Sequence, residues 1–224
     1  MQYAIVTGAT FGIGKSIANR LSDQYTVIAC GRRINLIEES RNIIPFKLDI
    51  TDNDSISGLS KYISDKSISI LVNCAGGGTS EFKDNILNQN AEDISSDFML
   101  NTSSTFNLIK SVVPKMNISD NPIIINITSI AGHEILNATP SYTIAKHAQS
   151  VLTNILRRDL AKSGVRVSEI IPSSVNSHNN PSMSDKCLDP SDIADIVSYI
   201  CNTKKHVDIN SISIGHVKEI PFCS

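Results

Sequence analysis

Three residues in the middle of the chain could together move a proton to or from a substrate oxygen. Tyr142 and Lys146 are four residues apart, and Ser129 precedes the tyrosine by thirteen positions. Residues spaced i and i+4 share one helix face, with Cβ atoms about 5 to 6 Å apart. A nearby ammonium favours tyrosinate, so we expect Lys146 to lower the pKa of Tyr142 from its usual value of about 10. Such a phenol can act as a general acid or base.

A glycine-rich turn follows the first predicted strand. Gly8, Gly12 and Gly14 stand directly before a predicted helix, in the pattern Gly-x-x-x-Gly-x-Gly. Glycines permit a tight backbone and the close approach of a pyrophosphate to the positive end of a helix. The turn therefore favours dinucleotide binding, although glycines also occur in turns that bind no ligand.

The residues after the second predicted strand favour one dinucleotide over the other. Dinucleotide folds usually carry an acidic residue there, which binds the ribose hydroxyls of NAD. This chain has Arg32 and Arg33 instead. Guanidinium groups can pair with a 2′-phosphate through charge-assisted hydrogen bonds, which favours NADP. Two solvated arginines at the start of a surface helix are the alternative interpretation.

Short apolar runs alternate with longer amphipathic segments along the chain. This alternation is typical of a doubly wound α/β fold of Rossmann type, with a mostly parallel sheet and helices on both faces. The seven predicted strands are residues 3–6, 25–29, 43–48, 68–72, 122–127, 165–171 and 209–214. The five predicted helices are residues 14–22, 55–64, 91–115, 141–163 and 191–203. The length suits one domain, residues 1–224, rather than two.

Two segments near the end of the chain carry further expectations. The helix at 141–163 should stop at Gly164 and turn an apolar stripe inward. The residues of this stripe are Ala145, Ala148, Leu152, Ile155 and Leu160. Residues 173–189 are rich in Ser, Asn and Pro without periodicity, which predicts a loop after the sixth strand. Ligands bind at this edge of open α/β sheets, so we expect the loop to shape the substrate site.

Composition narrows the classes of function. The 224 residues carry a formal charge of -2 with Lys and Arg scattered along the chain, so nucleic acid is not an expected partner. No apolar stretch approaches the roughly 20 residues that span a bilayer, and no charged leader precedes the first strand, which favours a cytoplasmic protein without a membrane partner. The five cysteines lack CxxC spacing, so we expect reduced thiols and no metal site.

Together these motifs resemble the short-chain dehydrogenase/reductase family. The glycine motif of the family, Thr-Gly-x-x-x-Gly-x-Gly, matches residues 7–14, and its Asn-Asn-Ala-Gly appears at residues 73–76 with Cys74 as the departure. The catalytic tetrad of the family falls on Asn101, Ser129, Tyr142 and Lys146. The resemblance runs from Tyr3 to the last strand. A second departure is Ser173, where the family usually has glycine after Pro172, and the loop that follows is short.

The resemblance implies a role for each tetrad residue. Tyr142 would donate a proton to a carbonyl oxygen that Ser129 holds, and Lys146 would lower the tyrosine pKa and bind the nicotinamide ribose. Asn101 would fix a water in a relay that returns a proton to Lys146. The reverse reaction uses the same phenolate as a base, so the direction stays open.

The resemblance also implies the cofactor-binding residues. Asp49, after the third strand, is expected beside the adenine, and Ser177 is expected close to the nicotinamide end. The expected cofactor-binding set is Gly8, Thr10, Phe11, Gly12, Ile13, Gly14, Arg32, Arg33, Asp49, Ile50, Asn73, Ala75, Gly76, Tyr142, Lys146, Pro172 and Val175. Phe11 and Cys74 are expected to pack rather than react. His133, His147 and His178 receive no acid–base role.

Three hypotheses about function follow. The leading one is an NADP-dependent carbonyl reductase that acts on a small or acyl-type ketone, such as a 3-oxoacyl thioester. The second is NAD-dependent oxidation of a secondary alcohol. The third is a nucleotide-binding regulator without catalysis, against which the complete tetrad argues. Family members usually form homotetramers or dimers through the helices that carry Asn101 and Tyr142, so we expect a homo-oligomer.

Overall fold

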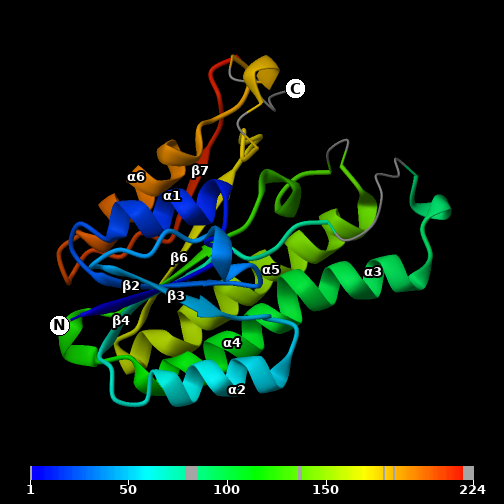
Figure 1. The fold of residues 1–224 in the computed structure, drawn as a ribbon. Helices are drawn as coiled ribbons and strands as arrows, with labels where there is room; N and C mark the ends of the chain where they lie inside the picture. The colour runs from blue at the N-terminus through cyan, green and yellow to red at the C-terminus, as the bar shows by residue number, and fades with distance from the viewer. Residues whose placement is uncertain (1, 79–84, 136–137, 179, 184, 219–224) are drawn as a thin grey trace.

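The computed structural model describes residues 2–78, 85–135, 138–178, 180–183 and 185–218. Its centre is a seven-stranded sheet in the order β3-β2-β1-β4-β5-β6-β7, and every pairing is parallel (Figure 1). The strands are β1 (Tyr3–Thr7), β2 (Thr26–Gly31), β3 (Ile43–Lys47), β4 (Ile68–Asn73), β5 (Ile123–Ile127), β6 (Arg166–Pro172) and β7 (Ser211–Ile214). All seven predicted strands are confirmed to within two residues at either end.

Helices cover both faces of the sheet, as Figure 1 shows. They are α1 (Gly12–Leu21), α2 (Asn53–Tyr62), α3 (Ala91–Phe98), α4 (Ser104–Val112), α5 (Pro140–Leu160) and α6 (Pro190–Cys201). One apolar core packs α1 and α6 against the sheet, and a second packs α2 and α4 against the opposite face. Successive strand residues point to opposite faces, so Ala4 and Val6 enter the first core and Ile5 enters the second. The predicted doubly wound α/β fold is confirmed.

The strand order indicates that a ligand would bind at the carboxyl edge of the sheet. The chain winds outward from β1 through β2 to β3, then crosses back to β4 on the other side of β1. Ligands of open α/β sheets bind at the carboxyl ends of the strands where the order reverses in this way. The glycine turn follows β1 at this edge, and Ser129 lies just beyond the end of β5.

The predicted helix at 91–115 is helical throughout but not uniform. A π-helical turn, Met99–Ser103, separates α3 from α4, and a 3-10 turn, Val113–Lys115, follows α4. Asn101 lies inside the π-helical turn, and its Nδ2 donates to the Asp97 carbonyl at 2.9 Å. Single π-helical turns inside α-helices are frequent at functional sites. Apolar periodicity alone does not reveal such a turn.

The buried face of α5 is more polar than predicted. Ala145 is buried as expected, but Ile155 is 43% exposed, so the apolar stripe is wrong at that position. The face turned towards the sheet instead carries Lys146, Gln149 and Thr153, whose hydrogen bonds compensate their burial. The predicted stop at Gly164 is confirmed by its φ of 73°, a left-handed conformation that glycine adopts readily.

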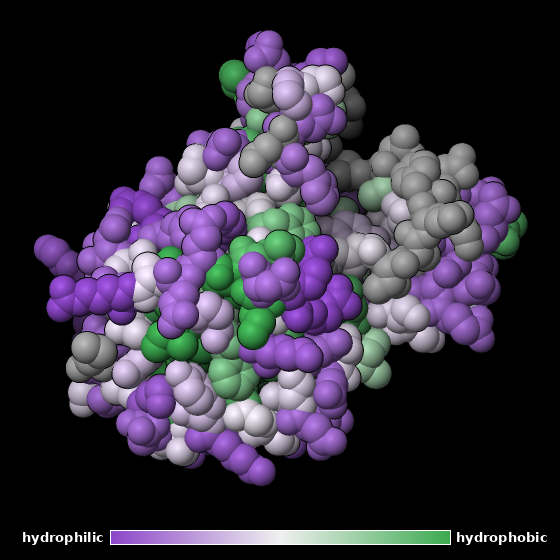
Figure 2. Space-filling view, viewed as in Figure 1, coloured by the Kyte–Doolittle hydropathy of each residue, from purple (hydrophilic) through white to green (hydrophobic). Residues whose placement is uncertain are grey.

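The surface and the late loop complete the fold. Figure 2 shows hydrophilic residues spread over much of the face that it presents, with a smaller apolar group near its centre. Within the described ranges, no helix has the length and apolarity to cross a membrane. The described part of the loop at 173–189 contains one short 3-10 turn, Pro181–Met183, and a bridge that pairs Val175 with Leu188.

Candidate active site

A cavity of about 430 Å³ lies at the carboxyl edge of the sheet. Ligand sites for small organic molecules commonly have volumes of roughly 300 to 1,000 Å³. Most of the residues predicted from the sequence line this cavity. They are Gly8, Thr10, Phe11, Ile13, Gly14, Arg32, Arg33, Asp49, Ile50, Ala75, Gly76, Ser129, Tyr142, Lys146, Pro172 and Val175.

Three predicted residues lie behind the cavity wall and support it. Gly12 has a φ of 55°, and a Cβ there would lie 2.8 Å from the Cβ of Ser177. The Asn73 side chain donates to Asn126 Oδ1 at 2.8 Å, which ties β4 to β5. Asn101 is fully buried, and its amide exchanges two hydrogen bonds of 3.0 and 2.9 Å with the backbone of Gly77.

The glycine turn presents a positive helix end to the cavity. Among the described residues, no side chain caps the first backbone amides of α1 at Phe11, and the first turn holds no acidic residue. A Cβ at Gly14 would overlap the carbonyl of Gly8, so only glycine allows the turn to close this tightly. Uncapped amides and the helix dipole attract phosphate groups. With Arg32 and Arg33 lining the same cavity, the residues present fit a phosphorylated dinucleotide.

Thr7 fixes the edge where the cavity forms, a role that the sequence reasoning missed. Its Oγ1 accepts hydrogen bonds of 3.0 Å from the backbone amides of Cys74 and Ala75. The same hydroxyl donates to the Val72 carbonyl at 3.4 Å. The end of β1 is thereby tied to the end of β4. Its place directly before Gly8 was the only signal in the sequence.

The structure contradicts the expected effect of Lys146 on the pKa of Tyr142. Burial raises the pKa of Tyr142 above its usual value, a hydrogen bond with Ser129 opposes this rise, and the charge of Asp97 adds to it. Lys146 Nζ lies 5.7 Å from the centre of the tyrosine ring. Its hydrogen bonds go elsewhere, to Gln149 and Ile127. Desolvation of the phenolate is therefore the main cause of the raised pKa.

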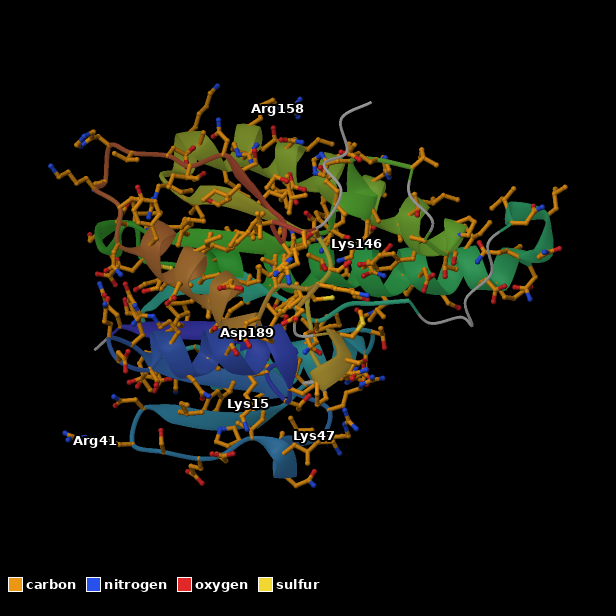
Figure 3. The ribbon with its side chains drawn as sticks, turned by 90° about the horizontal axis from the view of Figure 1, so that it is seen from above. Lys15, Arg41, Lys47, Lys146, Arg158 and Asp189 are labelled. Carbon is orange, nitrogen blue, oxygen red and sulfur yellow. The ribbon has the colours of Figure 1, made fainter. Side chains whose placement is uncertain are left out.

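Lys146 is the deeply buried cation of the site. Figure 3 shows it in the interior, whereas Arg41 and Arg158 lie at the periphery. Lys146 is 4% exposed. Burial lowers the pKa of its ammonium from 10.5 to about 8, and the nearby Cys74 and Glu169 partly oppose this shift. Lys146 therefore carries its charge at neutral pH and loses it as the pH rises through about 8.

The amino-acid sequence matches the family described as short chain dehydrogenase over residues 2–187. The chain belongs to this family. An uncharacterised oxidoreductase of Staphylococcus aureus strain N315 is 31% identical to this short-chain dehydrogenase, and the match covers 96% of each chain. A similar uncharacterised oxidoreductase of Staphylococcus saprophyticus is 33% identical over 96% of this chain and 97% of the relative. The predicted family membership is confirmed, and the protein is an oxidoreductase of this family.

Solved structures share the fold over almost the whole chain. An alcohol dehydrogenase from the archaeon Thermococcus sibiricus, complexed with 5-hydroxy-NADP, has a TM-score of 0.87 at 20% identity and covers 99% of both chains. The closed form of a serine dehydrogenase complexed with NADP+ has a TM-score of 0.87 at 26% identity, covering 100% of this chain and 98% of that one. These likenesses agree with the seven-stranded parallel sheet described above.

The two departures of this short-chain dehydrogenase from the family pattern leave the cavity intact. Cys74 lines the cavity, and burial raises the pKa of its thiol to about 12, so it stays protonated and packs. The backbone amide of Ser173 donates to the Ile214 carbonyl at 2.9 Å, which ties the loop to β7. The four described cysteines are free thiols: Cys30, Cys74, Cys187 and Cys201.

None of the three histidines considered above is among the residues that line the cavity. His133 Nε2 lies 3.0 Å from Glu169 and 3.2 Å from the Ser150 hydroxyl. His178 stacks on Phe11 with 5.3 Å between ring centres, so it joins the late loop to the glycine turn. Across the described ranges, no group of three or more His, Cys, Asp or Glu side chains could hold a metal ion.

Proposed function

We propose that the protein is an NADP-dependent carbonyl reductase for a small or acyl-type ketone. One observation carries the proposal. Ser129, Tyr142 and Lys146 line the same cavity as the glycine turn and the two arginines. A proton donor, an oxygen-holding hydroxyl and a dinucleotide-binding surface therefore meet in one place.

The raised pKa of Tyr142 supports the direction of reduction. A bound NADPH supplies the hydride in such a reaction. The Ser129 side chain lies near enough to the Tyr142 hydroxyl to lower its pKa, and both residues line the cavity, so one substrate oxygen can contact both. Because burial keeps Tyr142 protonated at neutral pH, its hydroxyl is ready to donate as the carbonyl oxygen gains charge. Ser129 orients the same oxygen by donating a hydrogen bond.

Lys146 and Asn101 have supporting roles in this proposal. The Lys146 ammonium would bind the ribose hydroxyls on the nicotinamide side. The Asn101 side chain is already engaged by Gly77 and by the Asp97 carbonyl, so it holds the cavity wall at 76–77 in place. Asn101 would also fix a water in a relay that returns a proton from solvent to Lys146.

Charge at the adenosine end supports NADP rather than NAD. Arg32 and Arg33 line the cavity beyond the end of β2. Asp49, which the family resemblance places beside the adenine, accepts hydrogen bonds of 3.0 and 2.7 Å from Thr51 through one oxygen. The two guanidinium groups could donate charge-assisted hydrogen bonds to a 2′-phosphate. The alcohol dehydrogenase and serine dehydrogenase structures named above contain NADP-type ligands.

Replacing Tyr142 by phenylalanine tests the catalytic proposal. The wild type should oxidise NADPH in the presence of at least one member of a panel of ketones and 3-oxoacyl thioesters. Tyr142→Phe should lower kcat by about 10²- to 10⁴-fold because the proton donor is gone. Tyr199→Phe is the matched control, since Tyr199 is 65% exposed. Full turnover by Tyr142→Phe would refute the role of Tyr142 as proton donor. A wild-type protein that binds NADPH but turns over no ketone would favour the nucleotide-binding regulator.

Reversing one charge beside the adenosine tests the choice of dinucleotide. Arg32→Asp should lower the ratio of kcat/KM for NADPH to that for NADH by about 10- to 100-fold, because a charged hydrogen bond contributes roughly 1.5 to 3 kcal/mol. Arg41→Asp is the control, since Arg41 is exposed and does not line the cavity. An unchanged ratio in Arg32→Asp would show that this guanidinium does not recognise the phosphate.

Exposed apolar side chains on α4 and α5 support a homo-oligomer. Phe106, Ile144, Val151 and Ile155 are 42%, 43%, 59% and 43% exposed. Apolar groups of this kind on neighbouring helices favour burial against a second copy. Light scattering should give at least twice the chain mass of 24.3 kDa, and Val151→Lys should lower it. A wild-type monomer at micromolar concentration would contradict the proposal.

A further inference from the structure

The buried ammonium of Lys146 has a partner on its own helix. Lys146 Nζ donates to Gln149 Oε1 at 2.8 Å and to the Ile127 carbonyl at 3.3 Å. Gln149 lies three residues further along α5 and is 1% exposed. Residues three apart are neighbours on a helix surface. The shorter of the two bonds is therefore made to a neutral side chain that is itself buried.

Three titratable groups lie around Lys146, but the side-chain oxygen that accepts its hydrogen bond belongs to Gln149. Cys74 faces the ammonium from the end of β4, Glu169 from β6, and Tyr142 from α5. The Glu169 carboxylate accepts hydrogen bonds from Thr128 at 2.8 Å and lies 3.0 Å from His133. Cys74 and Tyr142 have raised pKa values because of burial. The direct side-chain acceptor of the ammonium is thus an uncharged amide.

The two acceptors also fix the direction of the ammonium. An ammonium has three donors and no acceptor, and Gln149 and Ile127 take two of them. On the cavity side, a Cβ at Gly76 would lie 3.5 Å from Nζ, and both Gly76 and Lys146 line the cavity. One donor is therefore left for a ligand that enters there.

We propose that Gln149 is a positioning residue, whose amide oxygen holds the Lys146 ammonium at the cavity floor with one donor directed towards the nicotinamide ribose. This inference rests on the proposed function and extends it to a residue outside the tetrad. A neutral acceptor compensates a buried charge less than a carboxylate does. Gln149 thus sets how far the pH can rise before the lysine loses its proton.

The side chain of Gln149 can be changed without removing its structural contacts. The hydrogen bond that joins Gln149 to Thr153 uses the Gln149 backbone carbonyl and the threonine hydroxyl, at 2.8 Å. Thr153 in turn accepts from Asn126 on β5 at 2.8 Å. Substitution at the Gln149 side chain leaves this chain of contacts between α5 and the sheet in place, so it addresses the Lys146 contact.

Paired substitutions test the proposal. Gln149→Glu places a carboxylate against the ammonium and should raise the Lys146 titration midpoint by about 1 to 3 pH units. Gln149→Met removes the acceptor and should lower the midpoint. The midpoint is measured directly by NMR of protein labelled at lysine Cε, with Lys146→Met identifying the signal. Ser150→Ala is the control, because Ser150 follows Gln149 in α5, is also buried, and contacts His133 through its hydroxyl.

The pH dependence of turnover gives the second readout. The alkaline limit of kcat/KM for NADPH-dependent reduction should move in the same direction as the lysine midpoint in both variants, and stay in place in Ser150→Ala. A Lys146 midpoint in Gln149→Glu equal to that of the wild type would overturn the inference. Absence of turnover in the wild type would instead remove the proposed function, while the NMR titration would still decide the role of Gln149.

Discussion

A lysine ammonium enclosed by the protein and held by neutral acceptors is the constraint on which the site depends. Lys146 is 4% exposed and donates to a backbone carbonyl and an amide oxygen. Burying a charge is costly, and proteins compensate by hydrogen bonds or by lowering the fraction that is charged. The two hydrogen bonds are the first response, and the pKa of about 8, lowered by burial, is the second. The cost explains why α5 turns polar residues towards the sheet where an ordinary helix would place apolar ones.

The same edge of the sheet gathers positive charge from several sources. The uncapped start of α1, the guanidinium groups of Arg32 and Arg33, and the Lys146 ammonium all face one cavity. The chain as a whole has a formal charge of -2, so this concentration is local. Within it Tyr142 remains protonated because burial dominates its pKa. A neutral phenol beside a cationic cavity suits a reaction in which the substrate oxygen becomes negative and then takes a proton.

Much of this arrangement could be predicted from the sequence because it depends on spacing and on glycine. The alternation of apolar runs and amphipathic segments predicted every strand, and the turn at Gly8 to Gly14 could be read from steric requirements alone. The π-helical turn at Asn101 could not, since the Asn101 side chain also bonds the backbone of Gly77, which lies in a separate segment of the chain. The pKa of Tyr142 was predicted in the wrong direction because i,i+4 spacing says nothing about burial. The contact between Gln149 and Lys146 could not be predicted either, because it also depends on burial.

The dependence of NADPH affinity on pH tests the central claim most directly, because it needs neither a substrate nor a variant. Burial raises the pKa of Tyr142 above its usual value and that of the Cys74 thiol to about 12. The pKa of the Lys146 ammonium, at about 8, lies inside a test range of pH 7 to 10. If its ammonium binds the dinucleotide, Kd measured by NADPH fluorescence should be level below pH 8 and rise at least about tenfold by pH 10. A Kd that stays constant from pH 7 to 10 would contradict the account.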